Sequence, residues 1–260
     1  MSHLRLLSTD FDGTLIEHFS HGRCTADFAD VLRHHKKHGG VWAVNTGRGL
    51  VHAIEGVEKF QAPVQPDFLL TNEREIFHRS SDGRWMPEKG WNQTCYERHD
   101  ELFENSQALF DWLRSHADLR PGISIAEEDG RICGVITSTE SEMAEFVDLL
   151  EKKIALLPDF SYQRNTIYLR FAHRDYHKGS ALGELCRVLG IRHDEVLAAG
   201  DHFNDLPMLD GRFAAYPWCP SHAIPEVRET VLAAGGHVAS LPAANGVAES
   251  WRFFHTEHNK

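Results

Sequence analysis

The feature that most constrains the fold of this 260-residue chain is a repeated alternation between short apolar runs and segments with helical periodicity. The apolar runs lie at 4–8, 41–44, 67–70 and 195–199, and the helix-like segments at 25–38, 50–60 and 178–189. Each of these runs ends in a polar loop. Because consecutive parallel strands are joined by a crossover that is usually a helix, this alternation predicts an α/β fold with a doubly wound parallel sheet.

The middle of the chain has a different pattern. Hairpin signals appear over 76–91 and 123–136, the second with Asp129-Gly130 at its tip, and helix-like segments lie at 98–115 and 140–154. Strands and helices mixed in this way indicate an α+β unit rather than a continued parallel sheet. We therefore expect an inserted domain over 79–172, within a discontinuous core domain formed by 1–78 and 173–260.

Charge and composition exclude some classes of partner. The chain has 27 Lys and Arg against 38 Asp and Glu, a formal net charge of −11. Such a field repels nucleic acid and anionic membranes, so we expect neither as a partner. The five cysteines are widely spaced, and the chain has neither a signal-peptide pattern nor an apolar run of about 18–20 residues. The expectation is a cytoplasmic protein, a monomer or a small homo-oligomer.

Polar residues suited to phosphate chemistry follow the apolar runs or begin a helix: Asp10, Asp12, Thr46, Lys178, Asp201, Asn204 and Asp205. In an open parallel sheet, ligand sites form beyond the carboxyl ends of the strands, where such residues could converge. Several carboxylates together require a cation, and their oxygen ligands favour Mg²⁺. Lys178, and Thr46 with the Gly47 amide, could bind phosphate oxygens.

Two carboxylates at the first loop could share the chemistry. Asp10 and Asp12 are two residues apart, so they face the same side of an extended segment. One can attack phosphorus to form an aspartyl-phosphate, while the other protonates the leaving oxygen and then deprotonates the hydrolytic water. Arg48 could contact phosphate or only pair with a surface carboxylate, and the sequence leaves both interpretations open.

Four segments resemble the motifs of the haloacid dehalogenase superfamily of phosphohydrolases, in the same order and at similar spacing. They are Asp10-Phe11-Asp12-Gly13-Thr14-Leu15, Thr46-Gly47-Arg48, Lys178-Gly179 and Gly200-Asp201-His202-Phe203-Asn204-Asp205. The insert resembles, in layout, the cap of the Cof-type and sucrose-phosphatase-like branch. This resemblance implies a Rossmann-like core with an α+β cap.

The resemblance also implies a role for each motif residue. Asp10 would be the nucleophile, Asp12 the general acid and base, and Lys178 a fixed catalytic charge. The metal, Mg²⁺, would be held by Asp10, Asp201 and the backbone carbonyl of Asp12, with Asp205 supporting it through water. Phosphate would be bound by Thr46, Gly47, Arg48, Lys178 and Asn204.

Two segments depart from the family pattern, namely Asn45 before the second motif and Thr71-Asn72-Glu73-Arg74 before the insert. Both bear on the substrate more than on the chemistry. The expected function is a Mg²⁺-dependent phosphomonoesterase acting on a small phosphorylated metabolite, with a sugar phosphate implied by the resemblance. A phosphosugar mutase of the same superfamily and a non-catalytic phosphate-binding regulatory protein remain alternatives.

Other polar features have simpler interpretations. Asp201 could cap a helix by accepting backbone amides rather than binding metal, and His202 is expected to be an ordinary loop residue. His34, His35 and His38 lie on a mostly polar helix-like segment. We therefore expect these three histidines on a solvated face rather than in a metal site.

Overall fold

The computed structural model describes residues 4–17, 22–128 and 130–258. The chain forms two compact units, one of residues 1–92 with 178–260 and a second of residues 93–177. None of the described helices is both long enough and apolar enough to cross a lipid bilayer.

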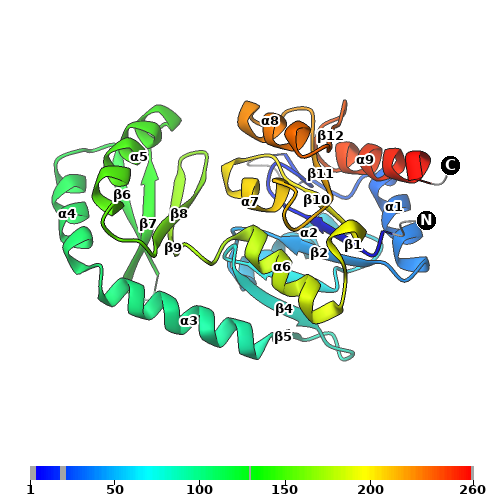
Figure 1. Cartoon of the computed structure of the whole chain (residues 1–260), viewed down its shortest axis with the longest axis horizontal. Helices are drawn as coiled ribbons and strands as arrows, with labels where there is room; N and C mark the ends of the chain where they lie inside the picture. Colours follow the sequence, from blue (N-terminus) through cyan, green and yellow to red (C-terminus); the bar gives the residue numbers. More distant parts are fainter. Residues whose placement is uncertain (1–3, 18–21, 129, 259–260) are drawn as a thin grey trace. The chain divides into compact units, whose positions relative to one another are not determined.

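The first unit contains, within its described residues, an eight-stranded sheet in the order β12-β11-β10-β1-β2-β3-β4-β5 (Figure 1). Its strands are β1 (Leu6–Thr9), β2 (Val41–Asn45), β3 (Phe68–Thr71), β4 (Glu75–Arg79), β5 (Trp85–Pro87), β10 (Val196–Ala199), β11 (Tyr216–Cys219) and β12 (His237–Val238). Pairing is parallel from β12 to β3 and antiparallel across β4 and β5. The predicted doubly wound parallel sheet is therefore confirmed, with two antiparallel strands added at one edge.

The added edge strands move the domain boundary away from its predicted place. β4 pairs with β3, with Phe68 opposite His78, so the first hairpin signal belongs to the core sheet and not to the insert. The second unit begins at Gln93 and ends at His177, rather than spanning the predicted 79–172. β3 and β4 form a hairpin of their own around a turn at 72–74, and the predicted hairpin over 76–91 did not include this turn.

Helices cover both faces of the core sheet because strand side chains alternate between the faces. One buried cluster joins Leu7 of β1 to α1 (Ala26–Lys37), α2 (Leu50–Phe60) and α9 (Ala243–His258). Another joins the neighbouring Leu6 to α6 (Lys178–Leu189), α7 (Leu206–Leu209) and α8 (Pro225–Ala233). Two short 3₁₀ helices, η1 (His193–Glu195) and η2 (Phe203–Asp205), flank β10.

His35 on α1 corrects the prediction of a fully solvated histidine face. Its side chain is buried, and its Nε2 donates to the carbonyl of Val41 at 2.9 Å. Burial lowers the pKa of His35 to about 4. A Cβ on Gly40 would approach the His35 ring to 2.4 Å, so this glycine leaves the space that the ring fills. His34 and His38 are exposed, as expected.

The second unit is an α+β layer with an antiparallel sheet in the order β6-β7-β9-β8. Its strands are β6 (Ile123–Glu128), β7 (Arg131–Thr137), β8 (Phe160–Asn165) and β9 (Tyr168–His173), and its helices are α3 (Lys89–Glu104, which starts in the first unit), α4 (Gln107–Asp118) and α5 (Glu140–Ile154). Apolar residues of the three helices pack on the sheet in one buried cluster. The helix expected over 98–115 is thus two helices, and Asp129 of the expected hairpin tip lies outside the described residues.

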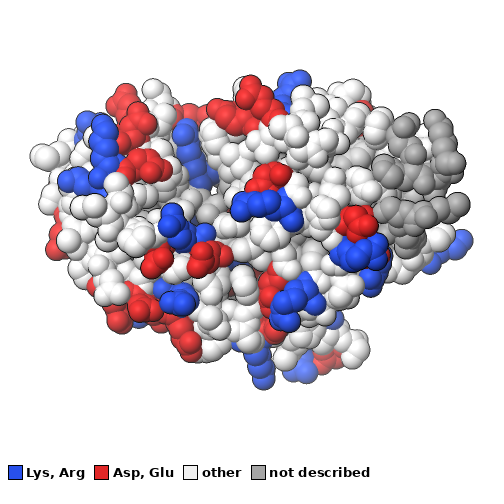
Figure 2. All heavy atoms as spheres, viewed as in Figure 1, with Lys and Arg blue, Asp and Glu red and all other residues white. Residues whose placement is uncertain are grey.

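Surface charges are interspersed rather than segregated on the face drawn in Figure 2. Exposed arginines lie beside acidic neighbours, as in the pairs Arg84–Asp82, Arg187–Glu184 and Arg192–Asp194. Exposed pairs of this kind add little stability. They do spread the excess negative charge over a surface of mixed sign.

Candidate active site

The first motif forms a tight loop at the carboxyl end of β1. The backbone N–H of Asp10 donates to Ala199 of β10 at 2.8 Å, and the Asp10 side chain is buried. Gly13 has a φ of +89°, a backbone conformation that favours glycine, and its N–H donates to the carbonyl of Ile16 at 2.7 Å. The loop therefore turns back immediately after presenting Asp10 and Asp12.

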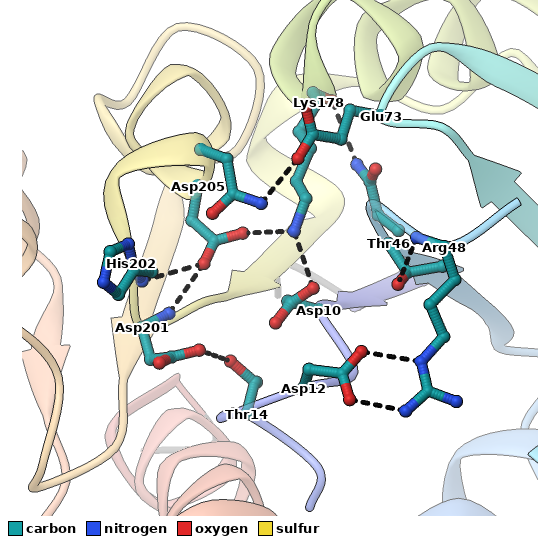
Figure 3. Close-up of polar contacts among 12 residues, drawn as sticks. Asp10, Asp12, Thr14, Thr46, Arg48, Glu73, Lys178, Asp201, His202 and Asp205 are labelled. Carbon is teal, nitrogen blue, oxygen red and sulfur yellow. Dashed lines mark hydrogen bonds and ion pairs between the residues drawn. The ribbon is translucent and has the colours of Figure 1, made fainter. Parts of the chain in front are cut away.

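Lys178, the first residue of α6, is a fully buried cation between two carboxylates. Its Nζ donates to Oδ1 of Asp10 at 2.6 Å and to Oδ1 of Asp205 at 2.7 Å (Figure 3). Burial by itself lowers the pKa of Lys178, but the charges of Asp10, Asp205 and Glu73 outweigh burial and raise it. Lys178 therefore stays protonated and supplies a fixed positive charge inside an acidic protein.

One hydrogen bond and one close approach set the place where α6 begins. Asn45, at the end of β2, donates from Nδ2 to the carbonyl of Lys178 at 3.0 Å. A Cβ on Gly179 would come within 2.0 Å of the carbonyl oxygen of Pro207. Only glycine at this position lets the start of α6 pack this closely against Pro207. Asn45, a departure from the family pattern, thus positions the helix that carries Lys178.

Three buried carboxylates, those of Asp10, Asp201 and Asp205, have oxygens within 4.8 Å of one another. Oδ2 of Asp10 is buried and has no hydrogen-bond partner among the described residues. Burial raises the pKa of Asp10 well above its usual range, Lys178 opposes this, and the other carboxylates add to it. The cluster carries more negative charge than Lys178 balances, so a hard divalent cation fits this donor set.

The loop after β10 is organised by Asp205 rather than by Asp201. Oδ2 of Asp205 accepts from the backbone N–H groups of Asp201 at 2.8 Å and His202 at 3.0 Å. With Oδ1 bonded to Lys178, both oxygens of Asp205 are engaged, which suits support of a metal through water better than direct ligation. Asp201 accepts instead from the hydroxyl of Thr14 at 2.9 Å. His202 lies in this loop, as expected, and its side chain is buried.

The second motif places Arg48 against Asp12. Nε of Arg48 donates to Oδ2 of Asp12 at 2.7 Å and Nη2 donates to Oδ1 at 2.5 Å (Figure 3). The hydroxyl of Thr46 accepts from the Arg48 N–H at 3.2 Å. Of the two interpretations open to Arg48, the structure therefore shows pairing with a carboxylate, and this carboxylate belongs to the site.

Glu73 lies among the site residues but was not predicted from the motifs. It is 5% exposed, and its Oε1 accepts from Nδ2 of Asn204 at 2.7 Å. Its backbone N–H donates to the carbonyl of Thr46 at 3.0 Å. The signal that could have found it is the departure at Thr71-Asn72-Glu73-Arg74, where a charged residue stands in the loop after β3.

The structure thus brings every predicted site residue into the first unit, at the carboxyl ends of its parallel strands. The sequence-distant links are the contacts of Lys178 with Asp10 and Asp205 and of Arg48 with Asp12 (Figure 3). Gly47 lies against Glu73. The residues so gathered are Asp10, Asp12, Thr46, Gly47, Arg48, Lys178, Asp201, Asn204 and Asp205. Acidic loops and the buried Lys178 thus meet at one edge of a doubly wound sheet, the place where an α/β enzyme is expected to bind its ligand.

Comparison with known proteins gives the family. A family model described as haloacid dehalogenase-like hydrolase matches residues 67–249, which include the third and fourth motifs. The chain belongs to the haloacid dehalogenase-like hydrolase family and is an enzyme of that class. The match begins after the first two motifs, whose place in the site is seen in the structure.

Individual relatives are distant. A Streptococcus pyogenes protein named "Putative phosphatase" is 23% identical over an alignment of 252 residues that covers 87% of this chain and 90% of the relative. The glucosylglycerol-phosphate synthase of Pseudomonas anguilliseptica is 27% identical over 209 residues, covering 80% of this chain and 25% of that protein. The crystal structure of the sucrose-phosphatase of Synechocystis sp. PCC6803, in complex with sucrose and phosphate, has a TM-score of 0.70 at 17% identity, covering 97% of this chain and 98% of that one.

Proposed function

We propose that this hydrolase is a Mg²⁺-dependent phosphomonoesterase that acts on a small phosphorylated metabolite, with a sugar phosphate as the substrate class. The observation that carries the proposal is the buried Lys178–Asp10 ion pair, in which Oδ1 of Asp10 accepts from Lys178 and Oδ2 is buried with no hydrogen-bond partner among the described residues. A carboxylate oriented in this way suits nucleophilic attack. Asp12, two residues away and partly exposed, suits proton transfer.

The reaction has two steps. A carboxylate oxygen of Asp10 forms a bond to phosphorus while the bond to the leaving oxygen breaks, and the carboxyl group of Asp12 gives its proton to that oxygen. Asp12, now a carboxylate, then takes a proton from a water molecule as the water oxygen attacks phosphorus. The second attack releases inorganic phosphate and restores both aspartates.

Residues around Asp10 would bind the phosphoryl oxygens. Lys178 supplies its fixed charge, Thr46 a hydroxyl, Gly47 a backbone N–H and Asn204 a side-chain amide. Asp10, Asp201 and the backbone carbonyl of Asp12 would hold Mg²⁺, with Asp205 behind them, and the ion would offset negative charge on the phosphoryl group. Arg48 holds Asp12 and thereby orients the proton donor.

The substrate class draws support from the names of similar proteins. The sucrose-phosphatase and the glucosylglycerol-phosphate synthase are both named for compounds that contain sugar. No disulfide joins the five cysteines, which all lie in the described part of the chain, and this fits the proposed cytoplasmic location. The second unit, proposed as the cap, would select the leaving group.

The test is release of inorganic phosphate from p-nitrophenyl phosphate and from a panel of sugar phosphates, with Mg²⁺ and with EDTA. Asp10→Asn serves as the blank, because it removes the nucleophile with little change of shape. Release that requires both Mg²⁺ and Asp10 supports the proposal. Wild-type-like turnover by Asp10→Asn would refute the mechanism, and formation of a sugar-phosphate isomer without net phosphate release would favour the mutase.

A further inference from the structure

Glu73 lies in a turn whose backbone is unusual for its residue types. The turn between β3 and β4 places two consecutive non-glycine residues in the left-handed region, Asn72 at a φ of +49° and Glu73 at +65°. Side chains with a Cβ rarely adopt this conformation, and it persists where surrounding contacts enforce it, often at functional sites. Glycine would adopt this backbone conformation with less strain than glutamate does. The Glu73 side chain therefore indicates a role beyond forming the turn.

Hydrogen bonds fix this turn to the second motif. The backbone N–H of Asn72 donates to the carbonyl of Arg48 at 2.9 Å, and the backbone N–H of Glu73 donates to the carbonyl of Thr46 at 3.0 Å. Glu75 accepts from the side chains of Thr71 and Asn72. Because the turn is held at both ends, the Glu73 carboxylate has a defined direction, toward the site.

The Glu73 carboxylate faces three groups that the proposed function assigns to phosphate. Its Oε1 accepts from Asn204 at 2.7 Å and lies 3.0 Å from where a Cβ on Gly47 would stand. Its charge contributes to the raised pKa of Lys178. Figure 3 shows Glu73 beside Lys178, with Asp201 on the opposite side of the cluster.

A carboxylate repels a phosphate dianion, so the Glu73 side chain is not itself a phosphate ligand. What it accepts are hydrogen bonds from hydroxyl or ammonium groups. The amide of Asn204 has two N–H groups, and with one given to Glu73 the other can reach a phosphoryl oxygen. In this arrangement only the Asn204 amide group lies between Glu73 and the phosphate. The first atoms of a leaving group bonded to the phosphate are long enough to reach Glu73.

We propose that Glu73 is a specificity-determining residue that binds a hydrogen-bond donor of the leaving group, a hydroxyl or an ammonium group next to the phosphate ester. This inference rests on the proposed phosphomonoesterase function. A leaving group rich in hydroxyl groups, as in a sugar phosphate, supplies such a donor. An aryl leaving group such as p-nitrophenol supplies none.

The experiment compares Glu73→Gln with the wild type on substrates that differ in the donor beside the phosphate ester: glucose 1-phosphate, glucosamine 1-phosphate and p-nitrophenyl phosphate. Glutamine keeps the length and the Oε1 acceptor for Asn204 but removes the charge. Glu229→Gln, an exposed charge change on α8, is the matched control. Glu73→Gly, which relieves the positive φ, reports whether the side chain is needed for folding, with thermal unfolding as the readout.

We expect Glu73→Gln to lower kcat/KM for the sugar phosphates by roughly ten- to hundredfold, the cost of losing a hydrogen bond to a charged group. The value for p-nitrophenyl phosphate should fall much less, because only the contacts of Glu73 with Asn204 and Lys178 change there. A larger loss on the amino sugar identifies an ammonium donor, and an equal loss on both sugars identifies a hydroxyl. Equal losses on all three substrates, or no loss on any, overturn the inference, whereas a wild type that hydrolyses none of them overturns the proposed function instead.

Discussion

Arg48 and Asp12 form a two-point ion pair in which Nε and Nη2 of the guanidinium donate to different carboxylate oxygens. The Arg48 guanidinium also lies 4.8 Å from the centre of the Phe11 ring, and a Cβ on Gly56 would come within 2.5 Å of its Nη1. Burial lowers the pKa of Arg48, but the hydrogen bond and charge of Asp12 outweigh burial and raise it. The side chain is thus held in one place, and Asp12 with it.

Replacing Arg48 should therefore reduce turnover more than substrate binding. We expect Arg48→Gln to lower kcat by roughly tenfold to hundredfold with a smaller change in KM, because Asp12 loses the group that orients it. Gly56→Ala, which crowds the guanidinium without changing charge, should reproduce part of this loss. Steady-state kinetics on p-nitrophenyl phosphate measure both constants. A rise in KM alone would mean that Arg48 binds phosphate instead.

Removing Lys178 should damage both stability and activity. Lys178→Met leaves Asp10 and Asp205 buried without their cation, which we expect to cost about 3–5 kcal/mol of unfolding free energy in urea titrations. The double variant Lys178→Met with Asp205→Asn should recover part of the stability, because one uncompensated charge is gone, but none of the activity. Recovery of activity in the double variant would contradict a catalytic role for the lysine.

Mg²⁺ should stabilise the folded protein in a pH-dependent way. The pKa of Asp10 is raised by burial, so the stability that this group contributes is present below its ordinary pKa and is lost as the pH rises through the raised value. The cation offsets that loss. We expect Mg²⁺ to raise Tm more at pH 8 than at pH 5. At a Mg²⁺ concentration roughly a hundredfold above Kd, bound Mg²⁺ adds about 3 kcal/mol to the free energy of unfolding.

Asp201→Asn and Asp10→Asn provide the comparison for the Mg²⁺ experiment. Both should show a smaller Tm increase on addition of Mg²⁺, whereas Glu229→Gln should behave as the wild type does. Scanning calorimetry with and without EDTA gives these shifts independently of activity. The same shift in all four proteins would show that the ion binds elsewhere.

Acid should destabilise the protein partly through His35. Its folded pKa of about 4 lies below the ordinary value of 6.5. The stability contributed by neutral His35 is therefore fully present above about pH 6.5 and is lost as the pH falls through about 4. Between pH 7 and pH 5 we expect this group to remove about 2 kcal/mol of unfolding free energy.

His35→Gln should flatten that part of the pH dependence, since glutamine can donate to Val41 but does not titrate. His193→Gln changes an exposed histidine and should leave the slope unaltered. Urea unfolding at pH 5, 6 and 7 measures the three slopes. An unchanged slope in His35→Gln would assign the acid sensitivity to other groups.

Much of the fold could be predicted because it depends on local patterns. The helical periodicity of 50–60 and of 178–189 predicted α2 and α6 with their observed bounds, and the alternation of strands and helices predicted the parallel sheet. β5 was expected in the insert but belongs to the core sheet, and β8 was not predicted. Their placement depends on which strand each one pairs with, and single-strand patterns do not contain that information.

The site divides in the same way. Short segments of sequence contain the residues whose types and order define the chemistry, namely Asp10, Asp12, Lys178 and Asp201. The sequence by itself therefore determined the family resemblance and the set of metal and phosphate ligands. Only the tertiary structure decided that Arg48 pairs with Asp12, that Asp205 organises the loop after β10, and that Glu73 faces Asn204. The two members of the Arg48–Asp12 and Glu73–Asn204 pairs are 36 and 131 residues apart along the chain. Such contacts form only when the sheet sets strand ends side by side, because hydrogen bonds act over about 3 Å in space, whatever the separation in sequence.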